Sequence, residues 1–151
     1  SLTSLKKVTF TTYIMILKEK PEKIFKERVG CVITFNNKYL LLHRTKDYFW
    51  NSVSGRVNQY ETPEEAIERK LRESLGVIVK PNKFTTLYQN YAGNNIVYHV
   101  FEHDFKEDPT SKIKLNFESF EFKFLDVDEA VKLPLFHDED YCLKLHSSKK
   151  Q

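Results

Sequence analysis

The chain has few residues of the kinds that mark disulfide scaffolds or membrane spans. Its 151 residues include only two cysteines, Cys31 and Cys142, which lie far apart and share no metal-ligand spacing. We therefore expect both thiols to be reduced and structural, as in an intracellular protein. No apolar run approaches the ~20 residues that cross a bilayer, and the Lys6-Lys7 start precedes no signal-peptide core or cleavage site. These absences predict a cytoplasmic protein without a membrane partner.

A large excess of one charge sign is also missing. The 24 basic and 21 acidic residues leave a formal net charge of +3. This mild excess suits an anionic small molecule, but it is not the footprint of a nucleic-acid binder. Aromatic residues are plentiful at 14 %, which argues against disorder. The length suits one domain over residues 1–151 with a sizeable core, as a monomer or a homodimer.

The stretch 55–77 predicts a loop that leads into an amphipathic helix. Thr62 is suited to cap the helix, with Pro63 in the first turn and Glu65 placed for a capping box. Gly76 follows the last turn, where a left-handed C-cap is expected. An apolar stripe and an ionic ladder each recur every four residues. The stripe is Ile67, Leu71 and Leu75, and the ladder is Glu65, Arg69 and Glu73.

Segments rich in β-branched and aromatic residues predict strands on both sides of this helix. They are 8–17, 29–35, 39–43, 84–91, 96–105 and 120–124, with turns at 36–37 and 92–95. A connector at 18–28, a polar loop at 107–112, short helices at 126–131 and 137–145, and a tail at 146–151 complete the chain. Strands, helix, strands and helix in this order predict an α/β (α+β) fold, with helices packed against a mixed sheet.

The strand at 120–124 alternates aromatic and charged residues. Phe120, Phe122 and Phe124 alternate with Glu121 and Lys123, which predicts one buried face and one solvated face.

At 55–77 the sequence resembles the Nudix (MutT-like) hydrolase family. The family's box is a Gly, five residues, a Glu, seven residues, then Arg-Glu-apolar-X-Glu-Glu-X-Gly-apolar. Lys70 and Ser74 stand where the family usually keeps carboxylates, so the box is degenerate. The resemblance extends over roughly 29–135 and implies a Nudix-type α/β/α sandwich. The matching residues are Gly55, Glu61, Arg69, Leu71, Glu73, Gly76 and Val77.

The resemblance implies a hydrolase that cleaves a diphosphate linkage in a nucleoside diphosphate derivative or a related small molecule, with Mg²⁺ or Mn²⁺ as cofactor. Such a metal offsets the charge on phosphoryl oxygens and takes carboxylate ligands. Glu73 is the main candidate ligand, and an ion pair with Arg69 is the alternative for it. The Gly55 carbonyl and Glu118 are further candidates, although Gly55 is also compatible with a simple turn. Glu61 and Arg69 match the residues that brace the loop against the helix.

Two branches of the family share further residues with this chain. The Phe-Trp-Asn-Ser-Val segment at 49–53 resembles the isopentenyl-diphosphate isomerases, but Ser54 and Arg56 replace the Cys and His that those enzymes need. Gly55-Arg56-Val57 is similar to the GDP-mannose mannosyl hydrolases, in which arginines matching Arg44 and Arg56 hold the diphosphate. Guanidinium groups suit this task because they bind phosphate oxygens in pairs.

The replaced carboxylates leave other functions open. Lys70 would repel a metal or pair with a phosphate, and Ser74 removes a second charge, so we expect weak or altered metal binding. The first alternative function is therefore a Nudix domain that binds nucleotide without turnover, and the second is an isomerase relative. Trp50 is suited either to stacking on a nucleobase or to filling the core. The five histidines share no motif.

Overall fold

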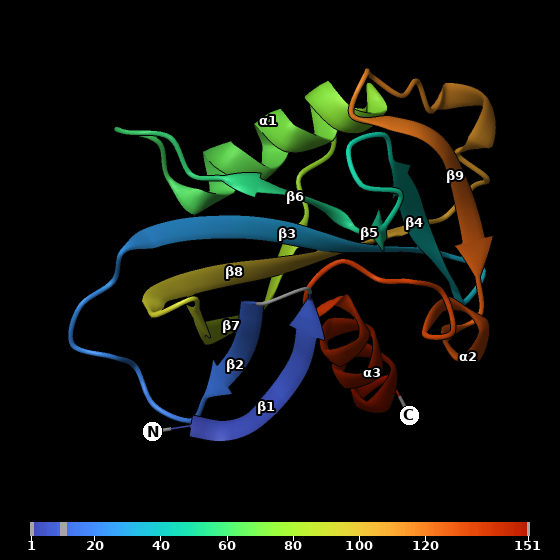
Figure 1. Ribbon diagram of the computed structural model, residues 1–151. Helices are drawn as coiled ribbons and strands as arrows, with labels where there is room; N and C mark the ends of the chain where they lie inside the picture. The colour runs from blue at the N-terminus through green and yellow to red at the C-terminus, as the bar shows by residue number, and fades with distance from the viewer. Residues whose placement is uncertain (1, 10–11, 151) are drawn as a thin grey trace.

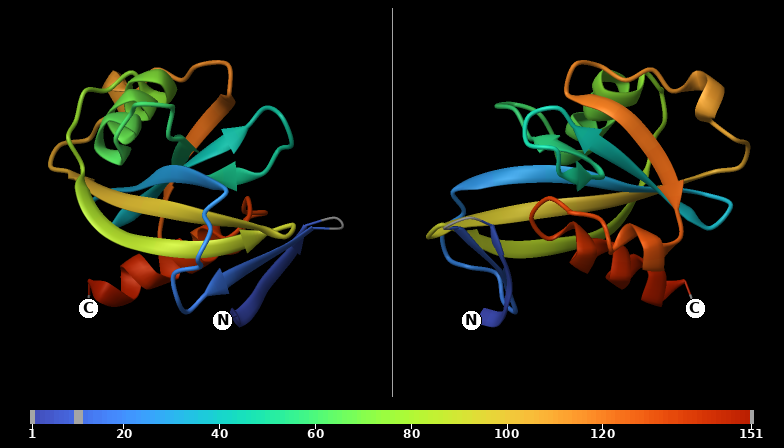
Figure 2. Two further views of the ribbon diagram at one scale, coloured as in Figure 1. Left: turned by 90° about the vertical axis from the view of Figure 1, so that its left-hand side faces the viewer. Right: turned by 45° about the vertical axis from the view of Figure 1, so that its right-hand side comes forward.

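One curved mixed sheet forms the middle layer of the molecule, with helices on both of its faces. The computed structural model describes residues 2–9 and 12–150. Within them nine strands join in one sheet, and α1 lies on the face opposite to α2 and α3 (Figure 1, Figure 2). The strands are β1 Leu2–Thr9, β2 Thr12–Leu17, β3 Lys26–Phe35, β4 Lys38–Arg44, β5 Trp50–Asn51, β6 Val53–Arg56, β7 Asn82–Tyr91, β8 Asn94–Phe105 and β9 Ser119–Leu125. The helices are α1 Pro63–Leu75, the short 3-10 helix η1 Thr110–Lys112, α2 Val127–Ala130 and α3 Glu139–Lys149.

Strand β3 is the central element of the sheet. It runs parallel to β8 along its whole length, which makes the sheet mixed. Its first half pairs with β6 and its last residues pair with β4, both antiparallel. Strands β6 and β4 therefore diverge from the same edge of β3, and β4 in turn pairs with β5 and β9. This divergence leaves a space between the end of β4 and β6, and Arg44 and Ser54 both line it.

The sheet separates two apolar cores, as the alternation of side chains along its strands requires. One core lies under α1, where Ile67, Leu71 and Leu75 pack against β3 and β4, so the predicted stripe is buried. The other lies under α2 and α3 and includes Leu41, Trp50 and Leu143. The mixed sheet with packed helices, predicted from the order of elements, and the α/β/α sandwich implied by the resemblance are thus confirmed. No helix in the described part of the chain is long and apolar enough to cross a membrane.

The predicted limits of α1 are confirmed by its end contacts. Thr62 and Glu65 form the reciprocal capping box, and Pro63 is the first helical residue. Gly76 adopts φ 70° and donates its N–H to the Arg72 carbonyl, which closes the last turn. The helix therefore starts and stops where the local sequence indicates, and this fixes the positions of the box residues that it carries.

Several element boundaries differ from the predictions. The single strand expected at 8–17 is instead divided between β1 and β2, which pair antiparallel with Thr9 opposite Thr12; residues 10 and 11 lie outside the described part. Strand β3 begins at Lys26, which shortens the connector expected at 18–28. Strand β8 begins at Asn94, since Ala92 and Gly93 adopt positive φ and complete the turn.

Two further expectations are wrong for reasons of long-range packing. Phe120 does not share a face with Phe122 and Phe124: an irregularity in the β4–β9 pairing leaves it 49 % exposed, with its ring against His43. Such a bulge turns a side chain to the other face. The tail expected at 146–151 is mostly the last turn of α3, and His146 is only 1 % exposed.

Candidate functional site

The loop before α1 is held to the helix by one arginine. Arg69 donates from Nε to Glu61 at 2.7 Å and from Nη2 to the other Glu61 oxygen at 3.0 Å. It also donates to the Arg56 carbonyl at 2.9 Å and to Glu73 at 3.2 Å. These bonds lower the pKa of Glu61 and raise the pKa of Arg69. The contacts are those expected of a brace, and they also include the predicted Arg69–Glu73 ion pair.

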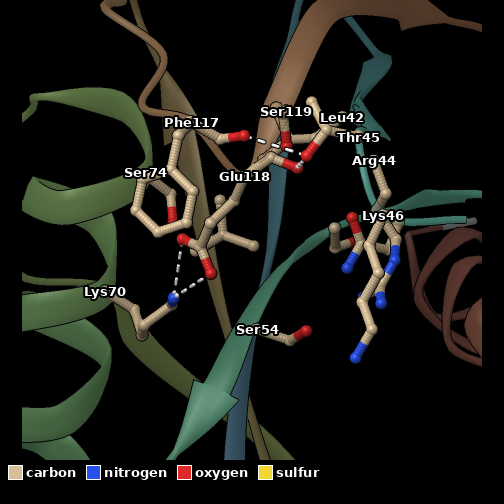
Figure 3. A pocket seen from close by; sticks show the side chains of 13 residues that line it. Leu42, Arg44, Thr45, Lys46, Ser54, Lys70, Ser74, Phe117, Glu118 and Ser119 are labelled. Atoms are coloured by element: carbon tan, nitrogen blue, oxygen red, sulfur yellow. Dashed lines mark hydrogen bonds and ion pairs between the residues drawn. The ribbon is translucent and has the colours of Figure 1, made fainter. Parts of the chain in front are cut away.

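A buried lysine lies beside this brace, in a cavity of about 210 Å³ between α1, β4 and the segment before β9. The Lys70 ammonium lies 3.1 and 3.3 Å from the two Glu118 carboxylate oxygens and 3.8 Å from Glu73 (Figure 3). Burial would raise the pKa of Glu118, but hydrogen bonds from Asn116 and Lys70 outweigh it, so the pKa is lowered. Glu118 is therefore an ionised partner of Lys70.

Gly55 is required by the path of this lysine. The residue lies within β6, paired with Val29, and the turn considered for it is not observed. A Cβ at Gly55 would lie 2.7 Å from Cδ of Lys70 and 2.8 Å from its Cγ. The absence of a side chain at Gly55 thus allows the Lys70 stem to cross β6 and reach Glu118.

The residues present do not fit a divalent metal. Among residues 2–9 and 12–150, no three His, Cys, Asp or Glu side chains are grouped as metal ligands would be. Mg²⁺ needs converging oxygen ligands. The two candidate carboxylates, Glu73 and Glu118, instead flank the Lys70 ammonium, and Ser74 contributes no charge. The Lys70 ammonium is thus the cation that these two carboxylates pair with.

A second cavity, of about 400 Å³, adjoins the first and is strongly basic. The two cavities share Arg44 and Lys46, which lie across the first cavity from Lys70 in Figure 3. Burial and then the charges of Arg28 and Arg56 lower the pKa of Lys26, as expected where cations crowd together. We call this cavity the basic cleft. Its five cations are Lys26, Arg28, Arg44, Lys46 and Arg56.

Arg44 is held in place at the junction of the two cavities. Its Nε donates to both Asp47 oxygens, at 2.9 and 3.1 Å, and its guanidinium lies 3.8 Å from the centre of the Phe136 ring. Arg56, by contrast, has an exposed side chain at the end of β6, and only its carbonyl is bound by Arg69. The structure therefore brings both arginines predicted from the sequence to one cleft.

Trp50 does not lie in either cavity. Its side chain is 4 % exposed, stacked on His43 with the ring centres 4.1 Å apart. It belongs to the core on the side of α2 and α3. The core-filling alternative considered for Trp50 is thus the one observed, and its use as a stacking platform for a base is wrong.

Two buried acids at the start of α3 were missed by sequence reasoning. Asp138 lines the basic cleft and accepts a hydrogen bond from Gln89. Glu139 accepts from the backbone N–H and hydroxyl of Ser52, at 3.0 and 2.9 Å. Burial raises the pKa of Asp138 and raises that of Glu139 to about 7. The acidic start of a helix is usually solvated, and no local signal indicated otherwise.

The match to known proteins agrees with this fold. Residues 25–145 match the NUDIX domain, and the chain belongs to this family. No curated protein matches the sequence.

Solved structures with the same fold have low sequence identity to the chain. A MutT protein from Methanosarcina mazei has 18 % identity and a TM-score of 0.71, over 87 % of this chain and 99 % of that one. The NUDIX domain of Shewanella oneidensis NrtR, complexed with ADP ribose, has 17 % identity and a TM-score of 0.72, over 89 % and 95 %. An Ap4A hydrolase from C. elegans has 19 % identity and a TM-score of 0.62, over 80 % and 96 %.

Proposed function

We propose that this Nudix domain binds a small molecule with a diphosphate linkage in the basic cleft and hydrolyses that linkage. The observation that carries the proposal is the convergence of five cations on one cleft, which adjoins the cavity that contains Lys70. One acid, Asp138, stands against these five cations in the lining of the cleft. The cleft therefore carries a large positive charge, although the whole chain has a formal net charge of only +3.

The chemistry of the cleft suits phosphate oxygens. Arg44 and Arg56 carry planar guanidinium groups, which bind two phosphate oxygens at once. The positions of Arg44 and Lys46 at the junction would allow a bound diphosphate to extend from the cleft toward Lys70. The ADP ribose complex of the NrtR domain and the activity named for the Ap4A hydrolase are consistent with such a ligand. The Mg²⁺ or Mn²⁺ dependence expected from the resemblance is not part of this proposal.

The test is phosphate release from a panel of nucleoside triphosphates, nucleotide sugars, ADP-ribose, dinucleoside polyphosphates and isopentenyl diphosphate, with and without Mg²⁺ or Mn²⁺. We expect turnover of at least one diphosphate compound. Arg56→Met should reduce kcat/KM by at least about tenfold, because each lost charged hydrogen bond costs about 1.5–3 kcal/mol. Arg72→Met is the matched control, because Arg72 is an exposed arginine of α1 outside the cleft.

The second candidate function is binding of the same class of ligand without turnover. The Lys70–Glu118 ion pair favours it, since it engages one of the candidate metal-binding carboxylates. Ligand-dependent stabilisation in a thermal shift assay, without phosphate release, would support this function. Release of an isomerised product from isopentenyl diphosphate would instead support the isomerase relative. No binding by any member of the panel would contradict all three.

A further inference from the structure

We propose that the Lys70 ammonium takes the place of a divalent metal, so that this site binds a phosphate without Mg²⁺ or Mn²⁺. The geometry around Lys70 supports the exclusion of a metal. The binding of a phosphate at this site rests on the proposed function.

The position of the ammonium is the first argument. It lies 3.1 Å from Glu118 and 3.8 Å from Glu73, between the two carboxylates that were the candidate metal ligands. A bound divalent cation and the Lys70 charge would repel each other at such short range, where partial burial limits screening by water. Lys70 and a metal are therefore alternatives at this place.

The second argument is that the fold accommodates this lysine specifically. The Lys70 side chain is only 11 % exposed. Its stem crosses β6 at the one residue of that strand that lacks a Cβ, Gly55. One turn along α1, the small Ser74 also lines the cavity and brings no charge. A buried ammonium costs free energy unless it is paired, and here Glu118 and Glu73 provide the pairing.

The third argument concerns the connection to the basic cleft. An ammonium has three donors, and Glu118 accepts from Lys70 with both oxygens. Lys70 lines the same cavity as Arg44 and Lys46, which continue into the cleft. A phosphate in this cavity would thus meet three cations, from α1, from the end of β4 and from the loop that follows β4. They supply the positive charge for which other proteins use a metal.

The first experiment needs no ligand. Binding of Mn²⁺ alone is measured by the electron paramagnetic resonance signal of the free ion. We expect no binding to the wild-type protein at micromolar Mn²⁺ and at least about tenfold tighter binding to Lys70→Glu and to Lys70→Glu/Ser74→Glu, because carboxylates are the ligands that such ions prefer. Lys80→Glu, on the exposed loop after α1, is the control for the change in net charge.

Thermal unfolding monitors the folding of each variant, and Lys70→Gln provides a neutral replacement if the glutamate variants do not fold. Micromolar Mn²⁺ binding by the wild-type protein would overturn the proposal. So would a failure of the folded glutamate variants to bind Mn²⁺ more tightly than Lys80→Glu.

The second experiment measures the affinity for pyrophosphate by calorimetry, in EDTA and in millimolar Mg²⁺. We expect the wild-type Kd to agree within about twofold between the two conditions, and Lys70→Gln to weaken binding about tenfold in both. Lys80→Gln should not change it. Strong dependence of wild-type binding on Mg²⁺ would contradict the role of Lys70. Absence of pyrophosphate binding in every condition would contradict the proposed function, and the Mn²⁺ experiment would still decide the question of the metal.

Discussion

Glu139 illustrates how one buried side chain links the fold to pH. It is 5 % exposed, packed beneath Ser52, and next to Asp138, whose pKa is also raised by burial. Arg28 opposes both shifts. Burial raises the folded-state pKa of Glu139 from its ordinary value of 4.5 to about 7. The folded protein therefore keeps this proton at a pH where the unfolded chain has lost it.

A group with a raised pKa contributes its full stabilisation of the folded state when the pH is below its pKa in the unfolded chain. The contribution is lost progressively as the pH rises through its pKa in the folded protein. We therefore expect Glu139→Gln to become more stable relative to wild type between pH 4.5 and 7, by an amount on the order of 3 kcal/mol. Urea denaturation of both proteins at several pH values measures this difference in the free energy of unfolding. Groups that titrate alike in the two proteins cancel in the difference. The exposed Glu129→Gln in α2 should show no such trend, and a parallel pH dependence of Glu139→Gln and wild type would refute the assignment.

Among the elements, α1 depends most directly on its local sequence. The hydroxyl of Thr62 accepts from the Glu65 N–H at 3.1 Å, and the Glu65 carboxylate accepts from the Thr62 N–H at 2.9 Å. We expect Thr62→Ala to lower the free energy of unfolding by about 0.5–2 kcal/mol, because the Glu65 N–H at the helix start loses the hydroxyl that accepts from it. Thr62→Ser keeps the hydroxyl and should lose much less. Equal losses in chemical denaturation would show that the cap is not the cause.

The contrast between α1 and β9 shows which parts of the fold a sequence can predict. Helix caps and an apolar stripe at helical spacing are local features of the sequence. They were sufficient to predict the limits of α1 and its buried face. In β9 the period-two pattern assumes an unbroken ladder, and the pairing of His43 and Arg44 with Glu121 and Ser119 breaks it at Phe120. The antiparallel pairing of β1 with β2 likewise has no local turn signal in 8–17.

The site follows the same rule. The Glu61–Arg69 brace spans eight residues and was expected from the box motif. The Lys70–Glu118 pair spans 48 residues and depends on how the segment before β9 approaches α1. The burial of Glu139 depends on contacts across 87 residues. These partners become neighbours only through tertiary packing, which composition and spacing do not describe.

For the molecule as a whole, the end of α3 contributes to closing the second core. His146 lies between two partners from the sheet: its Nδ1 is 2.8 Å from the Tyr39 hydroxyl, and its Nε2 is 2.9 Å from Glu102. Its ring also packs against Phe84. Residues from β4, β7, β8 and α3 thus meet at one buried histidine, in a segment that the sequence predicted to be a tail.

Removing residues 146–151 should therefore destabilise the whole fold. The deletion leaves the buried Tyr39 hydroxyl without its partner, which costs about 1–3 kcal/mol, and it also removes the packing of the imidazole. We expect the free energy of unfolding to fall by about 2–4 kcal/mol in urea denaturation. Deleting only Lys150 and Gln151 is the control: the Lys150–Glu102 ion pair at 3.4 Å is partly exposed, and exposed pairs contribute little. If the two truncated proteins had the same free energy of unfolding, the contacts of His146 at the end of α3 would not stabilise the domain.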